Sequence, residues 1–224
     1  MKILAINGSP NARGNTRAAL DIVAEQLASE GIECEIHQVG HKVIHGCMAC
    51  GLCARNKDER CAQADDGVNE LIQLMKSADG ILLGSPVHFA SIGGTMKSFL
   101  DRVFYVSGAN GNLLRHKVGA GLVAVRRTGG MTAFGQLNHY LMYAEMLVPT
   151  SNYWNVIHGA KPGEAVQDLE GVQLMRVLGK NMAWLLKLRA NGLAEVGSGM
   201  GGTEARLAVV APEKEAKVRM SFIR

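Results

Sequence analysis

Residues 1–16 of the chain read MKILAINGSPNARGNT. The apolar run at 3–6 is typical of a central strand that is buried on both faces. Gly8 and Pro10 end this run and turn the chain, and a helical pattern begins at Asn15 or Thr16. The stretch therefore predicts a βα unit, made of a buried strand, a polar loop and a helix.

The loop of this unit carries small polar side chains and one arginine. Free backbone N–H groups and the positive end of the helix dipole favour a phosphate at such a place. A Walker loop needs Gly-Lys-Ser/Thr and the dinucleotide fingerprint needs three spaced glycines, whereas this loop has only Gly8 and Gly14. We therefore expect the phosphate of a mononucleotide, and a βα turn that binds nothing is the alternative. The candidate contacts are Ser9, Asn11, Arg13, Asn15 and Thr16.

Length and composition favour one domain followed by a tail. The 224 residues are 47% hydrophobic, which is enough for a full core, and carry a formal net charge of +4. The basic residues are scattered, which argues against a nucleic-acid partner. The sequence has no secretory leader and no run of about 18 apolar residues, so we expect a cytoplasmic protein without a membrane partner.

Apolar strands alternate with helical patterns along the rest of the chain. This alternation requires parallel strands and right-handed crossovers, so it predicts a three-layer α/β sandwich. The expected sheet is flavodoxin-like, five-stranded and parallel, in the order 2-1-3-4-5. Further strands are predicted at 33–39, 81–84, 118–125 and 148–156, and further helices at 65–75, 96–103, 133–147 and 168–189.

The domain with this sheet is expected to span residues 1–190, with a cysteine-rich insertion at 46–61. Residues 191–224 are glycine-rich at first and then mixed in charge, so we expect a loop and tail with a short strand at 206–210. The glycines of 197–202 have Gly-x-Gly-x-x-Gly spacing, but too few residues follow them for a βαβ unit. They are therefore interpreted as part of the loop.

In such a sheet a ligand lies beyond the carboxyl ends of the strands, at the switch point. The turns after the first, third and fourth strands are rich in Gly, Pro, Ser and Thr, which predicts one site lined by all three. The third strand is followed by SPVHF at 85–89 and the fourth by RRTGG at 126–130.

Three segments resemble the flavodoxin-like NAD(P)H-dependent FMN reductases. GSPNARGNT at 8–16 is similar to their phosphate loop. SPVHF, followed by KSFLDR at 97–102, resembles their Ser-Pro-Val-Tyr-Trp and Lys-x-Phe-x-Asp-Arg segments, although His88 departs from the aromatic residue common there. RRTGG is similar to their loop beside the far edge of the isoalloxazine. The resemblance covers residues 1–190.

The resemblance implies bound FMN and, as a substrate, NAD(P)H, which passes hydride to flavin N5, so no side chain is expected to be catalytic. Glycines in the third turn let a flat ring approach closely, and an arginine there would hold a flavin carbonyl or the 2′-phosphate of NADPH. It also implies a homodimer or homotetramer, for which residues 140–154 offer an apolar surface. The cofactor contacts expected in these turns are Pro86, Val87, His88, Phe89, Arg126, Arg127, Thr128, Gly129 and Gly130.

Four of the five cysteines form a Cys-x2-Cys-x2-Cys-x7-Cys pattern at Cys47, Cys50, Cys53 and Cys61. Thiolates at such spacing can surround one cubane cluster. The pattern resembles that of the iron–sulfur flavoproteins, a branch of the same family, and so implies a [4Fe–4S] cluster. A zinc site and free or paired thiols near the active site are the alternatives. Cys34 is interpreted as a small buried hydrophobe.

Three functions follow from these features. The first is an FMN-dependent oxidoreductase with a [4Fe–4S] cluster that moves electrons between NAD(P)H or another donor and a small-molecule or protein acceptor. The second is a cluster-free NAD(P)H:FMN or quinone reductase. The third is a non-enzymatic flavodoxin-like electron carrier or a flavin-free binding protein.

Overall fold

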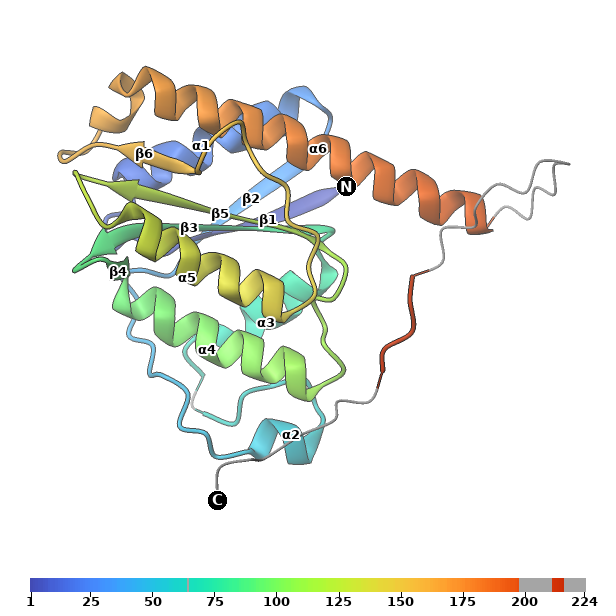
Figure 1. Cartoon of the computed structure of the whole chain (residues 1–224). Helices are drawn as coiled ribbons and strands as arrows, with labels where there is room; N and C mark the ends of the chain where they lie inside the picture. The colour runs from blue at the N-terminus through green and yellow to red at the C-terminus, as the bar shows by residue number, and fades with distance from the viewer. Residues whose placement is uncertain (64, 198–210, 216–224) are drawn as a thin grey trace, which may run out of the picture. The chain divides into compact units, whose positions relative to one another are not determined.

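A parallel sheet forms the centre of the computed structural model, which describes residues 1–63, 65–197 and 211–215. Its strands are β1 (Lys2–Asn7), β2 (Glu33–Gln38), β3 (Gly80–His88), β5 (Val118–Val125) and β6 (Val156–His158). They run in the order β2-β1-β3-β5-β6 and all pair in parallel (Figure 1). The predicted order 2-1-3-4-5 is therefore confirmed. The sequence missed β4 (Ser91–Ile92), which pairs antiparallel with the end of β3.

Helices cover both faces of the sheet, which gives the predicted three layers (Figure 1). One face carries α1 (Asn15–Ser29) and the first part of α6 (Leu169–Gly197). The other face carries α3 (Val68–Ser77), α4 (Gly94–Ala109) and α5 (Gly130–Tyr143), with the short α2 (Leu52–Asn56) beyond α4. A one-turn 3₁₀ helix, η1 (Glu164–Gln167), precedes α6.

The core consists of two apolar clusters, one on each face of the sheet. Alternate side chains of β1 point to opposite faces, so Ile3 and Ala5 join the cluster under α1 and α6. Leu4 and Ile6 join the cluster under α3, α4 and α5. This double burial explains why the first strand is a continuous apolar run.

The predicted fifth strand at 148–156 is wrong in extent, because only Val156–His158 pair with β5. Pro149 lacks an N–H group, and Ser151 then closes a turn by accepting a hydrogen bond from the Tyr153 amide and donating one to the Tyr153 carbonyl. The chain therefore leaves β5 after an isolated bridge at Leu147 and returns to it only at Val156.

The last helix is longer than predicted. Residues 191–197 continue α6 up to Gly197 instead of beginning a loop. Asn191 and Gly192 have low helix propensity but do not end a helix that is already formed. The chain divides into the compact units 1–186 and 187–224, and the strand predicted at 206–210 lies outside the described residues.

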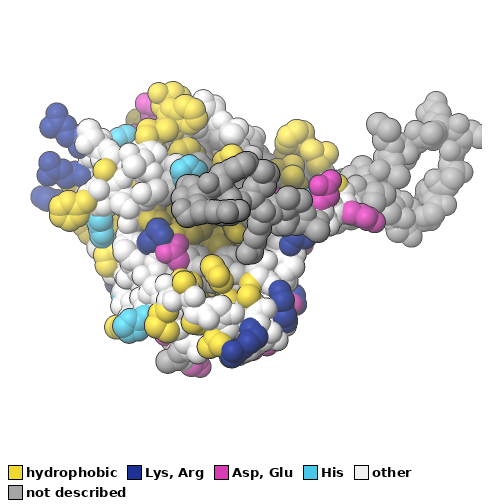
Figure 2. Space-filling view, turned by 60° about the horizontal axis from the view of Figure 1, so that its bottom comes forward, with side chains coloured by type: hydrophobic (Ala, Val, Ile, Leu, Met, Phe, Trp, Pro, Cys, Tyr) yellow, Lys and Arg dark blue, Asp and Glu magenta, His cyan; other side chains and the backbone are white. Residues whose placement is uncertain are grey.

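Among the described residues, no helix is long and apolar enough to cross a membrane. On the face seen in Figure 2, the described Lys and Arg side chains lie in separate groups.

Candidate functional site

A cleft of about 210 Å³ lies at the carboxyl edge of the sheet. Segments from four places in the sequence meet there: the loop after β1, the turn after β3, the end of β5 and the turn after β6. The predicted site residues that line it are Ser9, Asn11, Asn15, Thr16, Pro86, Val87, His88 and Arg126.

The loop after β1 is held by three successive Asx and Ser turns. The amides of Ser9, Asn11 and Arg13 donate to the side-chain oxygens of Asn7, Ser9 and Asn11, at 3.1, 3.1 and 3.0 Å. Helix α1 then begins without a side-chain cap. Because the first amides of a helix have no partner within the helix, the start of α1 offers N–H donors to an anion.

The end of β2 supports this loop from below. The buried Asn7 donates from Nδ2 to Gln38 Oε1 at 2.6 Å, and Gln38 Nε2 donates to the Ser9 carbonyl. Gly40 passes so close that a Cβ there would lie 2.2 Å from the Ser9 carbonyl carbon. A residue other than glycine at position 40 would therefore displace the loop.

The turn after β3 is a tight hairpin between β3 and β4. Val87 pairs with Ile92 and His88 with Ser91, so Phe89 and Ala90 form a two-residue turn with φ of 49° and 59°. Positive φ at both positions is typical of a type I′ hairpin turn, and is strained for a bulky residue such as Phe89. Gln136 of α5 holds the hairpin by accepting from the Ile92 amide at 3.0 Å.

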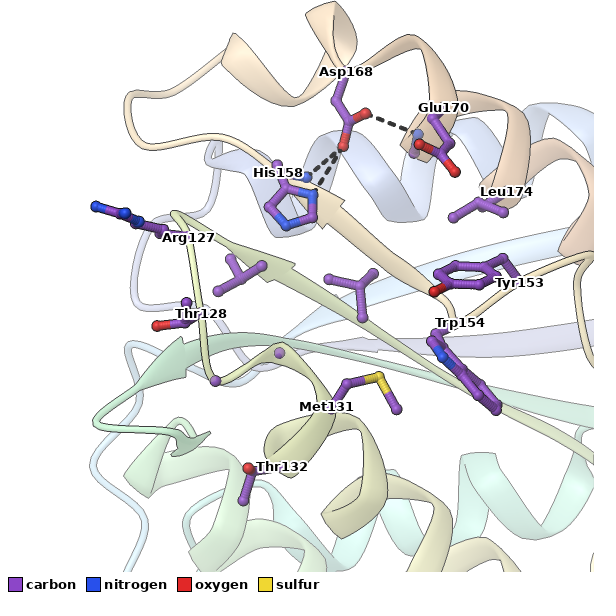
Figure 3. Close-up of a pocket in the computed structure, with 15 residues that line it drawn as sticks. Arg127, Thr128, Met131, Thr132, Tyr153, Trp154, His158, Asp168, Glu170 and Leu174 are labelled. Carbon is purple, nitrogen blue, oxygen red and sulfur yellow. Dashed lines mark hydrogen bonds and ion pairs between the residues drawn. The ribbon is translucent and has the colours of Figure 1, made fainter.

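The turn after β5 divides two hollows. Arg126 lines the cleft described above, whereas Arg127, Thr128, Gly129 and Gly130 line a neighbouring hollow of about 470 Å³ (Figure 3). Gly129 has φ of 86°, and a Cβ there would lie 3.0 Å from Ala90 Cα. The turn after β5 therefore packs directly on the hairpin after β3.

The neighbouring hollow is aromatic at one end and polar at the other (Figure 3). Tyr153 and Trp154 lie at the aromatic end, with rings 5.8 Å apart and exposed fractions of 63% and 51%. At the polar end, Asp168 accepts from the His158 amide at 2.7 Å and from the Gly171 amide at 3.0 Å. Partial burial opposes ionisation of Asp168, but these hydrogen bonds lower the pKa of its carboxyl below the usual value.

The turn after β6 is the part of the cleft that sequence reasoning missed. Gly159, Ala160 and Pro162 line the cleft, and Asn15 Oδ1 accepts from the Ala165 amide at 3.1 Å. The signal was the Gly-Ala-Lys-Pro-Gly segment at 159–163. It was overlooked because the fifth strand was expected to end before it.

Two predicted contacts do not line either hollow. Arg13 is exposed, and its position is fixed through its amide. Phe89 is fully exposed at the tip of the hairpin. Within one chain, neither side chain faces the cleft.

All four clustered cysteines line one small hollow beside α2 and α4. Cys47 and Cys50 are exposed, whereas Cys53 is buried. Burial raises the pKa of the Cys53 thiol, and the nearby Cys61 and Cys47 sulfurs raise that pKa further. Among the described residues, no three Cys, His, Asp or Glu side chains already stand in a metal-binding arrangement. The donor set is all sulfur, the chemistry that iron–sulfur clusters require.

Cys34 lies apart from this group on β2. Burial raises the pKa of its thiol to about 12, with a further contribution from Asp21. Its side chain packs against the apolar cluster under α1 and α6, in agreement with its interpretation as a small hydrophobe.

Residues 1–161 match the family model described as NADPH-dependent FMN reductase. The chain belongs to the NADPH-dependent FMN reductase family. Membership of this family makes the chain a flavoprotein oxidoreductase, and the sheet and helices described above form the flavodoxin-like fold. The loop after β1 provides hydroxyls, amides and a helix N-terminus of the kind that suits the phosphate of FMN.

Relatives of this FMN reductase-family chain include iron–sulfur flavoproteins and an azoreductase. It is 35% identical over 195 residues to an iron-sulfur flavoprotein of Methanocaldococcus jannaschii, covering 84% of this chain and 98% of the relative. It is 29% identical over 190 residues to an iron-sulfur flavoprotein of Methanosarcina thermophila, covering 84% and 96%. An NADPH azoreductase of Bacillus sp. is 28% identical over 139 residues, covering 62% and 67%.

The fold of this FMN reductase-family chain also matches solved structures. RosB, crystallised with 8-demethyl-8-formylriboflavin-5′-phosphate, superposes with a TM-score of 0.68 at 18% identity, covering 100% of this chain and 98% of RosB. A flavodoxin from the domain Archaea superposes with a TM-score of 0.54 at 16% identity, covering 84% and 99%. At these identities the likeness supports the fold alone.

Proposed function

We propose that the protein is an FMN-dependent oxidoreductase that moves electrons between NAD(P)H, or another donor, and an acceptor, with a [4Fe–4S] cluster on Cys47, Cys50, Cys53 and Cys61. The proposal of bound FMN rests on the convergence of four chain segments at the carboxyl edge of the sheet. The observation that carries the cluster part is the single hollow lined by four thiols.

The phosphate of FMN would lie against the start of α1. Ser9, Thr16 and Arg126 line the cleft, together with Gly14 and Asn15 at the start of the helix. The hairpin after β3 and the turn after β5 would hold the ring, since both present backbone at the cleft edge. Bound FMN would supply hydride and electron transfer, and the protein would supply binding, orientation and access.

The neighbouring hollow is suited to the second reactant. It adjoins the ring-holding turn at Gly129 and offers the Tyr153 and Trp154 rings for stacking. Arg127 lies at its opposite end (Figure 3) and provides a positive charge for a phosphate of NAD(P)H. This arrangement supports a nicotinamide or a flat aromatic acceptor as the ligand of the hollow.

The cysteines would hold the cluster after a local closure of residues 47–53. Cys53 and Cys61 are partly or fully buried, whereas Cys47 and Cys50 lie on an exposed segment with positive φ at Ala49 and Gly51. Such a segment can bring two thiolates onto iron without disturbing the core. A bound cluster would supply single-electron transfer.

Anaerobic purification is the deciding experiment. We expect a flavin band near 450 nm, released FMN in about one equivalent, and iron and sulfide at the level of one [4Fe–4S] cluster. Flavin without iron would leave the cluster-free NAD(P)H:FMN or quinone reductase, in which Cys50→Ser leaves turnover unchanged. Flavin without NAD(P)H oxidation would favour an electron carrier, and absence of flavin would overturn the proposal.

We also propose a homo-oligomer. Several apolar side chains of 140–154 are exposed, with Met142 at 67% and Tyr143 at 62%, and they support an interface with a second copy. Light scattering of the purified protein tests this, and a monomeric mass at micromolar concentration would contradict it.

A further inference from the structure

Arg102 on α4 is the largest of the fully buried side chains among the described residues, with 1% of its surface exposed. Its guanidinium makes an ion pair with Asp66, in which Nη2 lies 3.1 Å from Oδ1. Nε donates to the Cys61 sulfur at 3.3 Å, and Nη1 donates to the His45 carbonyl at 3.4 Å. A buried arginine is costly unless its donors are paired, so this part of the fold is built to hold it.

We propose that Arg102 is a positioning residue that fixes Cys61 as the ligand around which the cluster assembles, and that its N–H···S hydrogen bond raises the reduction potential of that cluster. The inference rests on the cluster of the proposed function.

Cys61 is held through both its backbone and its sulfur. Its amide donates to Asn69 Oδ1 at 2.7 Å, and its carbonyl accepts from Asn69 Nδ2 at 3.0 Å. The buried Asn69 on α3 therefore holds the backbone of Cys61 while Arg102 holds its sulfur. Cys47 and Cys50 are exposed, so the more mobile ligands would close onto a fixed one.

The charge of Arg102 determines the direction of the electronic effect. A cluster gains one electron on reduction, so its reduced form carries more negative charge than its oxidised form. A positive charge and an N–H donor at a cysteine sulfur stabilise the reduced form more, and therefore raise the potential. Asp66 neutralises part of this charge, but the N–H donor remains directed at sulfur.

Helix α4 also connects this arginine to the flavin cleft. The helix begins beside the turn after β3, where the Gly93 amide donates to Ser85 Oγ at 3.0 Å. Arg102 lies about two turns further along the same helix. A change in the turn after β3 and a change at the cysteines would therefore act on one rigid element.

The test uses full-length protein and two readouts. The first is the midpoint potential of the cluster, titrated anaerobically with dithionite and dye mediators. The second is amide hydrogen exchange around Cys61 in apoprotein without iron. The variants are Arg102→Gln, Arg102→Lys, and Asp66→Asn/Arg102→Gln, which leaves no unpaired buried charge. Arg55→Gln, on the exposed side of α2, is the matched control.

We expect a lower cluster potential in both variants that carry Arg102→Gln and a smaller shift in Arg102→Lys. The smallest shift is expected in Arg55→Gln, because solvent screens that exposed charge. Amide exchange at Cys61 should rise by about tenfold in the apoprotein of Arg102→Gln, as expected for loss of hydrogen bonds from a charged group. Unchanged potential together with unchanged exchange would overturn the inference while leaving the proposed function intact. Wild-type protein purified without iron would overturn the cluster assignment, and with it the role of Arg102 in setting a potential. If the amide exchange at Cys61 were then also the same in wild type and Arg102→Gln, the role of Arg102 in fixing Cys61 would be overturned too.

Discussion

Asn7 and Gln38 meet side chain to side chain beneath the loop after β1, with 2.6 Å between Asn7 Nδ2 and Gln38 Oε1. Asn7 ends β1 and Gln38 ends β2, and the two residues stand opposite each other in the sheet. Gln38 also donates to the Ser9 carbonyl. The second strand thereby fixes the shape of a loop that belongs to the first.

Replacing Gln38 by leucine should loosen this loop. Gln38→Leu leaves the fully buried Asn7 amide without its partner, which costs about 1–3 kcal/mol of the free energy of unfolding. FMN affinity should fall as well, because the Ser9 carbonyl loses its donor. Urea unfolding of the apoprotein and fluorescence titration with FMN measure the two effects. Gln173→Leu, at an exposed position of α6, is the control that should change neither.

Replacing Phe89 by asparagine should raise the free energy of unfolding. Phe89 has φ of 49° and a fully exposed ring, so its backbone strain has no compensating burial within the chain. Asparagine adopts this conformation more easily, and Phe89→Asn should raise the free energy of unfolding by about 1 kcal/mol. Phe89→Leu keeps the strain, and equal Tm values for the two variants would contradict the argument.

The aromatic end of the neighbouring hollow should determine how tightly the second reactant binds. Removing the Trp154 ring takes away a stacking surface at the hollow, so Trp154→Ala should raise the KM for NAD(P)H or for an aromatic acceptor by about tenfold. The control is Trp184→Ala, since Trp184 is exposed on α6 and lies outside the hollow. If Trp154→Ala and Trp184→Ala had the same KM for NAD(P)H and for the acceptor, the hollow would be excluded as the site of the second reactant.

Asp168 should stabilise the fold in a pH-dependent manner. Asp168 precedes α6 and accepts from the Gly171 amide, so Asp168→Ala should cost about 1 kcal/mol at pH 7. Its folded-state pKa is lowered, so the carboxylate contribution is present above the unfolded-state pKa of about 3.9 and is lost as pH falls through the folded-state pKa. The difference between wild type and variant should therefore narrow in acid. Asp168→Asn, which can still cap the helix, should lose less stability at pH 7.

The cysteines should differ in reactivity toward iodoacetamide in apoprotein. The pKa of Cys34 is about 12, so this thiol stays protonated from pH 7 to pH 10 and should react slowly throughout. Cys47 and Cys50 are exposed and should be alkylated first. Mass spectrometry of timed samples measures the order. Alkylation of Cys34 as fast as that of Cys47 would show that β2 opens.

The βα unit at 1–16 and the position of three turns could be predicted from the sequence, because both depend on local signals: apolar runs, glycines, prolines and helix periodicity. The sheet order followed from the alternation of strands and helices, which only a few parallel topologies accommodate. The sequence also placed four cysteines in one short segment. The folded chain alone shows that Gln38 supports the loop after β1 and that the turn at 159–163 completes the cleft. Arg102 reaches Cys61 across 41 residues of chain. These relationships depend on packing between distant segments, and neither hydropathy nor propensity along the chain encodes which side chains will meet. The extent of β6 was missed for the same reason, since its pairing with β5 is a long-range contact.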